Sequence, residues 1–166
     1  TDGDIQNSRN LKIGHDATLD LNGNSEYFRD LHGGGTILNT DSNNITLRIG
    51  RGGTFTGIIN ETETNNGKIS LRYTGNSDRT MDGLNTYTGE TTIEGNGLVI
   101  VSNLANGGSA SGLGASTNAA SNFVIIGNDI TPDTNGFLDI SGIRYDGWDS
   151  VTTDRLFTFG STAEGA

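Results

Sequence analysis

The sequence contains no cysteine and a single proline in 166 residues. The lack of cysteine excludes disulfides, thiolate metal sites and cysteine nucleophiles. No apolar run approaches the length of a transmembrane helix, so we expect no membrane insertion by this chain. Windows long enough to reveal a helix show no apolar stripe at helical spacing, which points away from an α-helical fold.

Basic residues are scarce: 10 lysines and arginines oppose 20 aspartates and glutamates, and the net charge is −10. Binding to nucleic acid relies on the neutralisation of phosphates, and anionic membranes likewise attract basic segments. The acidic balance therefore argues against nucleic acid and anionic membranes as partners, and it fits a solvated exterior.

Hydrophobic residues are also few, at 31%, whereas glycine is abundant, with 26 residues. A disordered chain would combine a low apolar content with few β-branched residues and much proline. Here isoleucine, valine and threonine recur at regular intervals. The composition therefore favours an ordered fold that has frequent turns and a thin core.

Short segments of alternating apolar and polar residues recur along the chain, separated by glycine, asparagine and aspartate. Alternation with a period of two residues predicts half-buried strands. Residues 1–10 are predicted to form a polar N-terminal arm and 11–166 a single domain, with an Ala/Ser/Gly-rich loop at 104–122. The expected strands are 11–13, 17–21, 36–39, 45–49, 54–59, 68–73, 90–94, 98–101, 123–126, 136–140, 143–145 and 156–159.

Apolar residues in apparently equivalent positions, namely Leu19, Ile37, Phe55 and Leu71, are separated by 16 to 18 residues. A repeat of about 20 residues that carries two or three short strands is typical of a solenoid, whose thin core suits the low apolar content. The sequence thus predicts an all-β fold, a right-handed parallel β-helix (β-solenoid) of about eight coils. A β-sandwich has strands at similar spacing, but the repeated unit lacks clear hairpin pairing.

The stretch 83–100, GLNTYTGETTIEGNGLVI, resembles the passenger-associated repeat of bacterial autotransporters, whose core is close to N-T-Y-T-G-x-T-T-I-x-x-G-x-L. Segments 17–23, 52–59, 102–125 and 153–160 resemble other parts of such passengers, so the resemblance covers most of residues 11–160. It implies an extracellular, β-helical surface protein and says little about activity, because these repeats form stalks. The matching residues are Asn85, Thr86, Tyr87, Thr88, Gly89, Thr91, Thr92, Ile93, Gly97 and Leu98.

The favoured functional hypothesis is a structural module of a cell-surface fibre, filament or passenger stalk. The open ends of a solenoid expose unpaired backbone groups, which favour strand addition or head-to-tail stacking of subunits. We therefore expect self-association as the principal partner interaction. The residues expected to take part are Asp4, Ile5, Leu11, Leu156, Phe157 and Phe159.

An adhesin-like module that binds glycan or matrix is the alternative function. Aromatic side chains offer a flat platform for a sugar, and Tyr145 with Trp148 is the candidate pair. The loops at 60–66 and 128–135 and the lateral faces of the solenoid are further candidate binding surfaces.

A polysaccharide-cleaving enzyme is the weakest of the three hypotheses. Asn39-Thr40-Asp41 and Gly14-His15-Asp16 partly match motifs of such β-helix enzymes. Glycoside cleavage, however, requires an acid and a base carboxylate on opposite sides of the bond, and the other elements of the motif set are missing. We therefore predict that the chain is not an enzyme.

No cofactor is expected, and calcium is the one ion left open. Oxygen-bearing side chains gather in three short stretches of turn-like sequence, but none of them matches an EF-hand or a glycine-rich calcium repeat. His15 and His32 are isolated from any second ligand at metal spacing. The calcium candidates are Asp2 with Asp4, Asp20 with Asn22 and Asn24, and Asp129 with Asp133 and Asn135.

Overall fold

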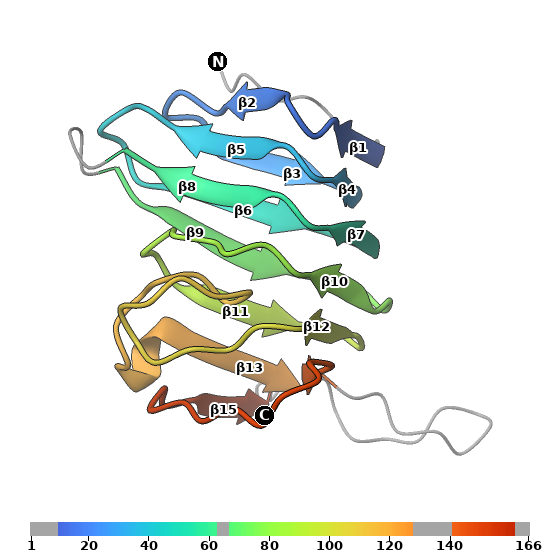
Figure 1. The fold of residues 1–166 in the computed structure, drawn as a ribbon, viewed down its shortest axis with the longest axis vertical. Helices are drawn as coiled ribbons and strands as arrows, with labels where there is room; N and C mark the ends of the chain where they lie inside the picture. The colour runs from blue at the N-terminus through green and yellow to red at the C-terminus, as the bar shows by residue number, and fades with distance from the viewer. Residues whose placement is uncertain (1–9, 63–66, 128–140, 162–166) are drawn as a thin grey trace, which may run out of the picture.

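The computed structural model describes residues 10–62, 67–127 and 141–161 (Figure 1). These residues form short β-strands and one 3₁₀ turn, η1. The elements are β1 (Asn10–Ile13), β2 (Thr18–Asp20), β3 (Glu26–Phe28), β4 (Asp30–Gly33), β5 (Thr36–Asn39), β6 (Ile45–Ile49), β7 (Gly53–Phe55), β8 (Ile58–Glu61), β9 (Ile69–Tyr73), β10 (Arg79–Met81), β11 (Thr91–Glu94), β12 (Leu98–Val101), η1 (Ala120–Asn122), β13 (Phe123–Gly127), β14 (Gly142–Tyr145) and β15 (Thr158–Ser161).

The strands assemble into three parallel sheets that run along one axis (Figure 1). The first sheet has the order β1-β4-β7-β10-β12-β14, the second β2-β5-β8, and the third β3-β6-β9-β11-β13-β15. Each of the first three coils contributes one strand to every sheet, and each strand pairs with the equivalent strand of the next coil. The predicted all-β parallel β-helix is confirmed.

The predicted number of eight coils is wrong, because each long sheet contains six strands in the described part of the chain. The expected number of coils was derived from a spacing of 16 to 18 residues between apolar residues that do not all belong to the same sheet. Leu19 and Ile37 are true partners in the second sheet, but the partner of Ile37 in the next coil is Ile59. Phe55 belongs to the first sheet and Leu71 to the third. All three sheets bury alternate residues, so their patterns look alike in sequence.

Several strands form where the alternation predicts them, including β5, β6 and β12. The expected strand at 54–59 is instead divided into β7 and β8, since the chain turns a corner at Gly57. A Cβ atom there would lie 1.9 Å from the Gly35 carbonyl oxygen. The short strands β3, β4 and β10 were missed, and the strand expected at 156–159 begins later, at Thr158. The strand expected at 136–140 lies outside the described residues.

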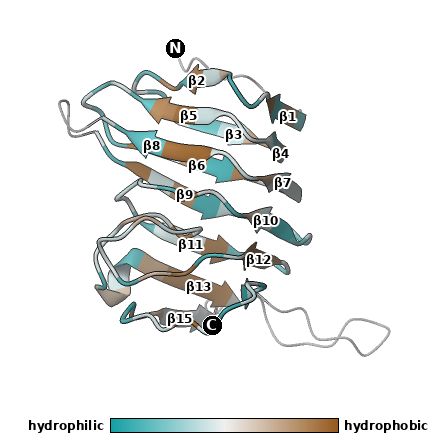
Figure 2. Ribbon diagram, in the orientation of Figure 1, coloured by the Kyte–Doolittle hydropathy of each residue, from teal (hydrophilic) through white to brown (hydrophobic). Residues whose placement is uncertain are grey.

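Alternate residues of the strands point inward and form one apolar core along the axis. The hydropathy colouring marks hydrophobic stretches on strands such as β6 and β13 (Figure 2). In β6, for example, Ile45, Leu47 and Ile49 are buried while Thr46 and Arg48 face solvent. Equivalent inward positions stack on one another from coil to coil, as Leu47 does on Leu71. A narrow core of this kind needs few apolar residues per coil, which explains the low hydrophobic content.

Side-chain oxygens at the corners connect each coil to the next. In each case an Asp, Asn or Ser side chain accepts a hydrogen bond from a backbone N–H that lies 20 to 24 residues later in the chain. These bonds satisfy backbone donors where the strand ladder is interrupted. The pairs, at 2.9–3.2 Å, are Asp20 with Thr40, Ser25 with Thr46, Asn44 with Lys68, Ser70 with Glu90, Asp78 with Leu98, and Asp82 with Ser102.

The second sheet ends at β8, where residues 84–88 take the place of a further strand. Asn85 accepts a hydrogen bond from the Ile59 N–H through Oδ1 at 2.9 Å and pairs with Ser111 as an isolated antiparallel bridge. The Ala115 N–H donates to the Tyr87 carbonyl at 2.8 Å. The loop at 104–122 therefore folds under residues 84–88 and closes this side of the solenoid.

Arg155 holds the folded loop in place from its interior. Its side chain is 4% exposed, and its guanidinium lies 4.8 Å from the centroid of the Phe123 ring. Burial lowers the pKa of Arg155, although arginine remains charged at neutral pH. The guanidinium donates to the carbonyl oxygens of Ala105, Asn106, Ser109, Gly114 and Ser116, at 2.8–3.3 Å.

We expect Arg155→Ala to destabilise the fold by about 2–4 kcal/mol, because it leaves several buried carbonyl groups without a donor. Urea unfolding monitored by circular dichroism measures the change. Arg144→Ala is the matched control: its ion pair with Asp146, at 3.5 Å, is solvent-exposed, and its loss is expected to cost less than about 1 kcal/mol. Equal effects of the two substitutions would contradict the structural role of Arg155.

Candidate functional site

The motif that resembles autotransporter repeats contributes mainly to packing. Tyr87 is fully buried, and its hydroxyl lies 2.8 Å from Thr91 Oγ1. A Cβ atom at Gly89 would lie 2.2 Å from the Ile69 carbonyl oxygen, so the coils approach closely there. Thr86 Oγ1 donates to Asn60 Oδ1 on the preceding coil at 2.7 Å. The motif thus encodes contacts between coils.

The residues that partly match an enzyme motif are engaged in a turn. Asn39 is buried, its Oδ1 accepts from the Gly23 N–H at 2.9 Å, and its Nδ2 donates to the Gly67 carbonyl at 3.2 Å. Asp41 Oδ1 accepts from the Asn43 N–H at 2.8 Å. These contacts shape the corner after β5.

Asp20 is the best-defined carboxylate of this corner. The Thr40 hydroxyl donates to Asp20 Oδ2 at 2.6 Å, and this hydrogen bond lowers the pKa of Asp20. The same carboxylate accepts from the Asn22 N–H at 3.0 Å. Its oxygens therefore stabilise the turn, which is the ordinary use of such a residue.

No group of three or more His, Cys, Asp or Glu residues that could hold a metal ion occurs in the described part of the chain. Of the calcium candidates, Asp2, Asp4, Asp129, Asp133 and Asn135 lie outside the described residues. His15 is exposed beside Asp16, with Nδ1 3.0 Å from the carboxylate, and His32 Nδ1 accepts from the Thr54 N–H at 3.4 Å.

The residues selected for assembly differ in exposure. Leu11 is partly buried against the core. At the other end, Leu156 and Phe159 are 58% and 76% exposed, whereas Phe157 packs against Phe123 with ring centroids 5.6 Å apart. Asp4 and Ile5 lie outside the described residues. The structure thus presents apolar side chains on and beside β15.

The two aromatic residues selected as a sugar platform are in different surroundings. Tyr145 is partly buried against the core and donates from its hydroxyl to the Asp149 carbonyl at 2.8 Å. Trp148 is fully exposed. The aromatic contacts found among the described residues do not include a pairing of these two rings.

The outer face of the third sheet carries an ordered set of polar side chains, which we call the lateral face. It is defined by Tyr27, Arg48, Arg72, Thr92 and Val124, which follow one another in register across β3, β6, β9, β11 and β13. The equivalent strand positions lie roughly 4.8 Å apart along the axis. Their side chains therefore lie in a row along the axis.

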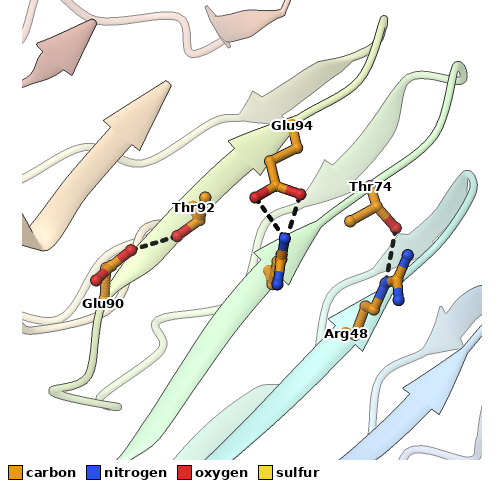
Figure 3. A network of polar contacts seen from close by, with 6 residues as sticks. Arg48, Thr74, Glu90, Thr92 and Glu94 are labelled. Atoms are coloured by element: carbon orange, nitrogen blue, oxygen red, sulfur yellow. Dashed lines mark hydrogen bonds and ion pairs between the residues drawn. The ribbon is translucent and has the colours of Figure 1, made fainter. Parts of the chain in front are cut away.

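Two kinds of polar contact order this face (Figure 3). Arg72 forms a two-point interaction with Glu94, with Nε–Oε2 at 3.0 Å and Nη2–Oε1 at 2.8 Å. The Thr92 hydroxyl donates to the carboxylate of Glu90. Arg48 instead donates from Nε to Thr74 Oγ1 at 3.2 Å, and its guanidinium lies 5.2 Å from the centroid of the Tyr27 ring.

Two hollows lie on the sides of the solenoid. One, of about 350 Å³, lies on the lateral face and is lined by hydroxyl and charged groups, with Val124 and Ile126 at one end. The other, of about 750 Å³, lies beside β8 and residues 84–88 and combines exposed Ile58 and Leu84 with Thr and Asn side chains. Binding at either hollow stays a prediction.

The contacts of the arginines were not predicted from the sequence. Arg48 and Arg72 alternate with apolar residues in two strands, so the sequence predicts that both point outward. It does not predict that the two strands pair with Arg48 opposite Arg72. Arg155 follows a polar segment and gives no sign of burial. Arg79 is also buried, 1% exposed, and lies 5.5 Å from the centroid of the Tyr73 ring.

The chain is 37% identical over 143 residues to "Adhesin BmaC autotransporter" from Brucella suis biovar 1 (strain 1330). The match covers 86% of this chain and 4% of that protein, so the chain spans a small part of its relative. This similarity, together with the parallel β-solenoid, confirms the resemblance to autotransporter passenger repeats.

No protein-family model matches the chain, and no solved structure matches it significantly. Among the described residues, no helix has the length and apolar character needed to cross a membrane.

The pKa of Asp20 provides a test of the corner geometry. We expect Thr40→Val to raise this pKa toward the ordinary value, because the hydroxyl that stabilises the charged form is lost. A depressed pKa contributes stability above the unfolded-state value, and this contribution is lost as pH falls through the folded-state pKa. The part of the stability difference between wild type and Thr40→Val that depends on pH should therefore be lost in acid.

An NMR titration of the Asp20 carboxyl carbon measures the pKa, and acid unfolding measures the stability difference. Thr18→Val is the control, because Thr18 is an exposed residue of β2, the strand that also carries Asp20. An Asp20 pKa that is the same in Thr40→Val as in wild type would contradict the assignment.

Proposed function

We propose that this chain is a β-solenoid segment of the surface-exposed passenger of an autotransporter-type adhesin, with a structural role as part of a stalk. The observation that carries the proposal is the continuous parallel stack of two long sheets in a chain similar to an autotransporter adhesin. A stack of this kind lengthens by roughly 4.8 Å per coil and projects whatever it carries away from its base.

An extracellular or cell-surface location follows from the same proposal. It is supported by the relative, whose name identifies it as an autotransporter adhesin. The chain has no cysteine, so its fold is stabilised without disulfides. The corner hydrogen bonds between coils supply the cross-links that small secreted domains often take from cystine bridges.

A non-enzymatic role is part of the proposal. The residues that partly match an enzyme motif, Asn39 and Asp41, use their polar atoms in the corner after β5. Glycoside cleavage needs two carboxylates that face a common substrate, and Asp20 is committed to Thr40 and Asn22.

Surface location can be tested in the bacterium that makes the protein. An epitope tag inserted between His15 and Asp16, which are exposed in the turn between β1 and β2, should leave the strands intact. We expect the tag on the full-length protein to bind antibody on intact cells and to be removed by added protease. A cytoplasmic protein carrying the same tag is the control. Labelling only after lysis would contradict the proposal.

End-to-end association of copies is a second candidate role, favoured by the exposed Leu156 and Phe159 at the C-terminal end of the described stack. Parallel strands of β1 and β4 pair in the same manner as those of β12 and β14, so an end strand of one copy could extend the sheet of another. Such a contact does not close on itself and gives a filament.

We expect the mass of the particles formed by the purified chain to increase with protein concentration. The double variant Leu156→Ser/Phe159→Ser should abolish this increase, because it removes apolar contact area between copies. Light scattering coupled to size-exclusion chromatography measures the mass. Ile58→Ser, which removes an exposed apolar side chain from the side of the stack, is the control and should behave as wild type. A monomer at all concentrations would contradict the association.

A further inference from the structure

Arg48 and Arg72 occupy equivalent positions in successive coils. They are direct partners in the pairing of β6 with β9, and both point outward. Each reaches toward the residue that lies one coil further on and two positions later: Thr74 for Arg48, and Glu94 for Arg72. The solenoid therefore repeats the same geometry with a different partner.

The two partners satisfy a guanidinium to different degrees (Figure 3). Glu94 receives two bonds from Arg72, the planar fork geometry that arginine and carboxylate favour. Thr74 offers a single hydroxyl to Arg48 Nε, at 3.2 Å. Among the residues that the structure describes, no carboxylate lies within ion-pair distance of Arg48. The carboxylate position is thus filled in one coil and open in the other.

The Arg48 side chain is nevertheless held in place. Its guanidinium lies over the Tyr27 ring at 5.2 Å, and Thr74 fixes the Nε end. The Tyr27 ring in turn sits on Gly50, where a Cβ atom would lie 2.1 Å from the Tyr27 hydroxyl oxygen. An arginine that is already ordered loses less conformational entropy when it binds a ligand.

We propose that Arg48 binds the carboxylate of an acidic saccharide on the lateral face. The carboxylate of the ligand binds the Arg48 guanidinium as the Glu94 carboxylate binds that of Arg72. The Tyr27 ring packs against the Arg48 guanidinium. The sugar ring extends into the adjoining hollow of about 350 Å³, whose lining includes Thr46, Ser70 and Thr92.

A saccharide fits this surface better than a simple anion. The hollow is lined by the hydroxyl groups of Thr46, Ser70 and Thr92 and by the charged groups of Arg72, Glu90 and Glu94, all of which can exchange hydrogen bonds with sugar hydroxyls. The net charge of −10 repels every anion at long range, an acidic saccharide included, so binding depends on direct contacts, and a saccharide offers more of them than a simple anion.

The experiment uses the whole 166-residue chain with 3′-sialyllactose as the probe and lactose as its neutral counterpart. NMR follows the Arg48 Nε–H signal and the backbone signals of β6 and β9 during titration. We expect saturable shifts with the acidic sugar and none with lactose. Acetate, which supplies a carboxylate without a sugar, should bind at least about tenfold more weakly, because it lacks the hydroxyl contacts.

Three variants test the site. Arg48→Gln removes the guanidinium and should weaken binding about tenfold or more. Thr74→Glu supplies an internal carboxylate, as Glu94 does for Arg72, and should abolish binding while the protein remains folded. Arg51→Gln is the matched control, because it removes an exposed arginine of the same charge and should leave binding unchanged.

Loss of binding in Arg48→Gln and Thr74→Glu, with retention in Arg51→Gln, would establish the site. Equal losses in all three variants would indicate charge attraction alone and overturn it. Equal binding of lactose or acetate, or the absence of any saturable shift, would also overturn it. If Thr74→Glu fails to fold, the comparison of Arg48→Gln with Arg51→Gln still tests whether Arg48 binds the sugar.

This inference goes beyond the structural stalk role proposed above, and its failure is distinguishable from failure of that role. A chain that binds no acidic sugar but carries an accessible tag on intact cells would remain a stalk segment. If the chain binds the sugar in solution but its tag is inaccessible on intact cells, the binding site is supported and the surface location is contradicted.

Discussion

The register between successive coils is the constraint on which the rest of the structure depends. Each strand pairs in parallel with its counterpart in the next coil, and inward residues stack on equivalent residues. A slip of one residue would turn every apolar side chain outward. Corner side chains such as Asp20, Asn44 and Asp82 prevent this slip, because each binds one defined backbone N–H of the following coil. Polar residues in turns are therefore as important for the register as the apolar core.

This constraint separates the residues that build the solenoid from those that are free to interact. Inward and corner positions are fixed by neighbouring coils, which accounts for the burial of Asn39, Asn85 and Tyr87. Outward positions have no such requirement, so Arg48 and Arg72 can differ in their partners while their backbones remain equivalent. The lateral face is accordingly the surface where a binding function can vary without disturbance of the fold.

The register between coils is kept even where one coil is irregular. After β8 the second sheet gives way to residues 84–88 and the loop at 104–122, yet the first and third sheets continue in register. The loop has few large apolar side chains to bury, so a buried guanidinium organises its carbonyl groups instead. Arg155 acts at a distance of about forty to fifty residues in sequence from the groups that it binds.

The sequence by itself determined the secondary-structure class, because alternation and turn residues are local signals, and the quoted motif pointed correctly to autotransporter passengers. Strands such as β6 and β12 were predictable for the same reason. The tertiary structure alone decided which strands are partners: the three sheets share one alternating pattern, so Phe55 and Leu71 could not be assigned to different sheets from spacing. It alone also placed Thr74 beside Arg48 and Glu94 beside Arg72, since contacts across coils depend on register, and local sequence does not encode the register between distant strands.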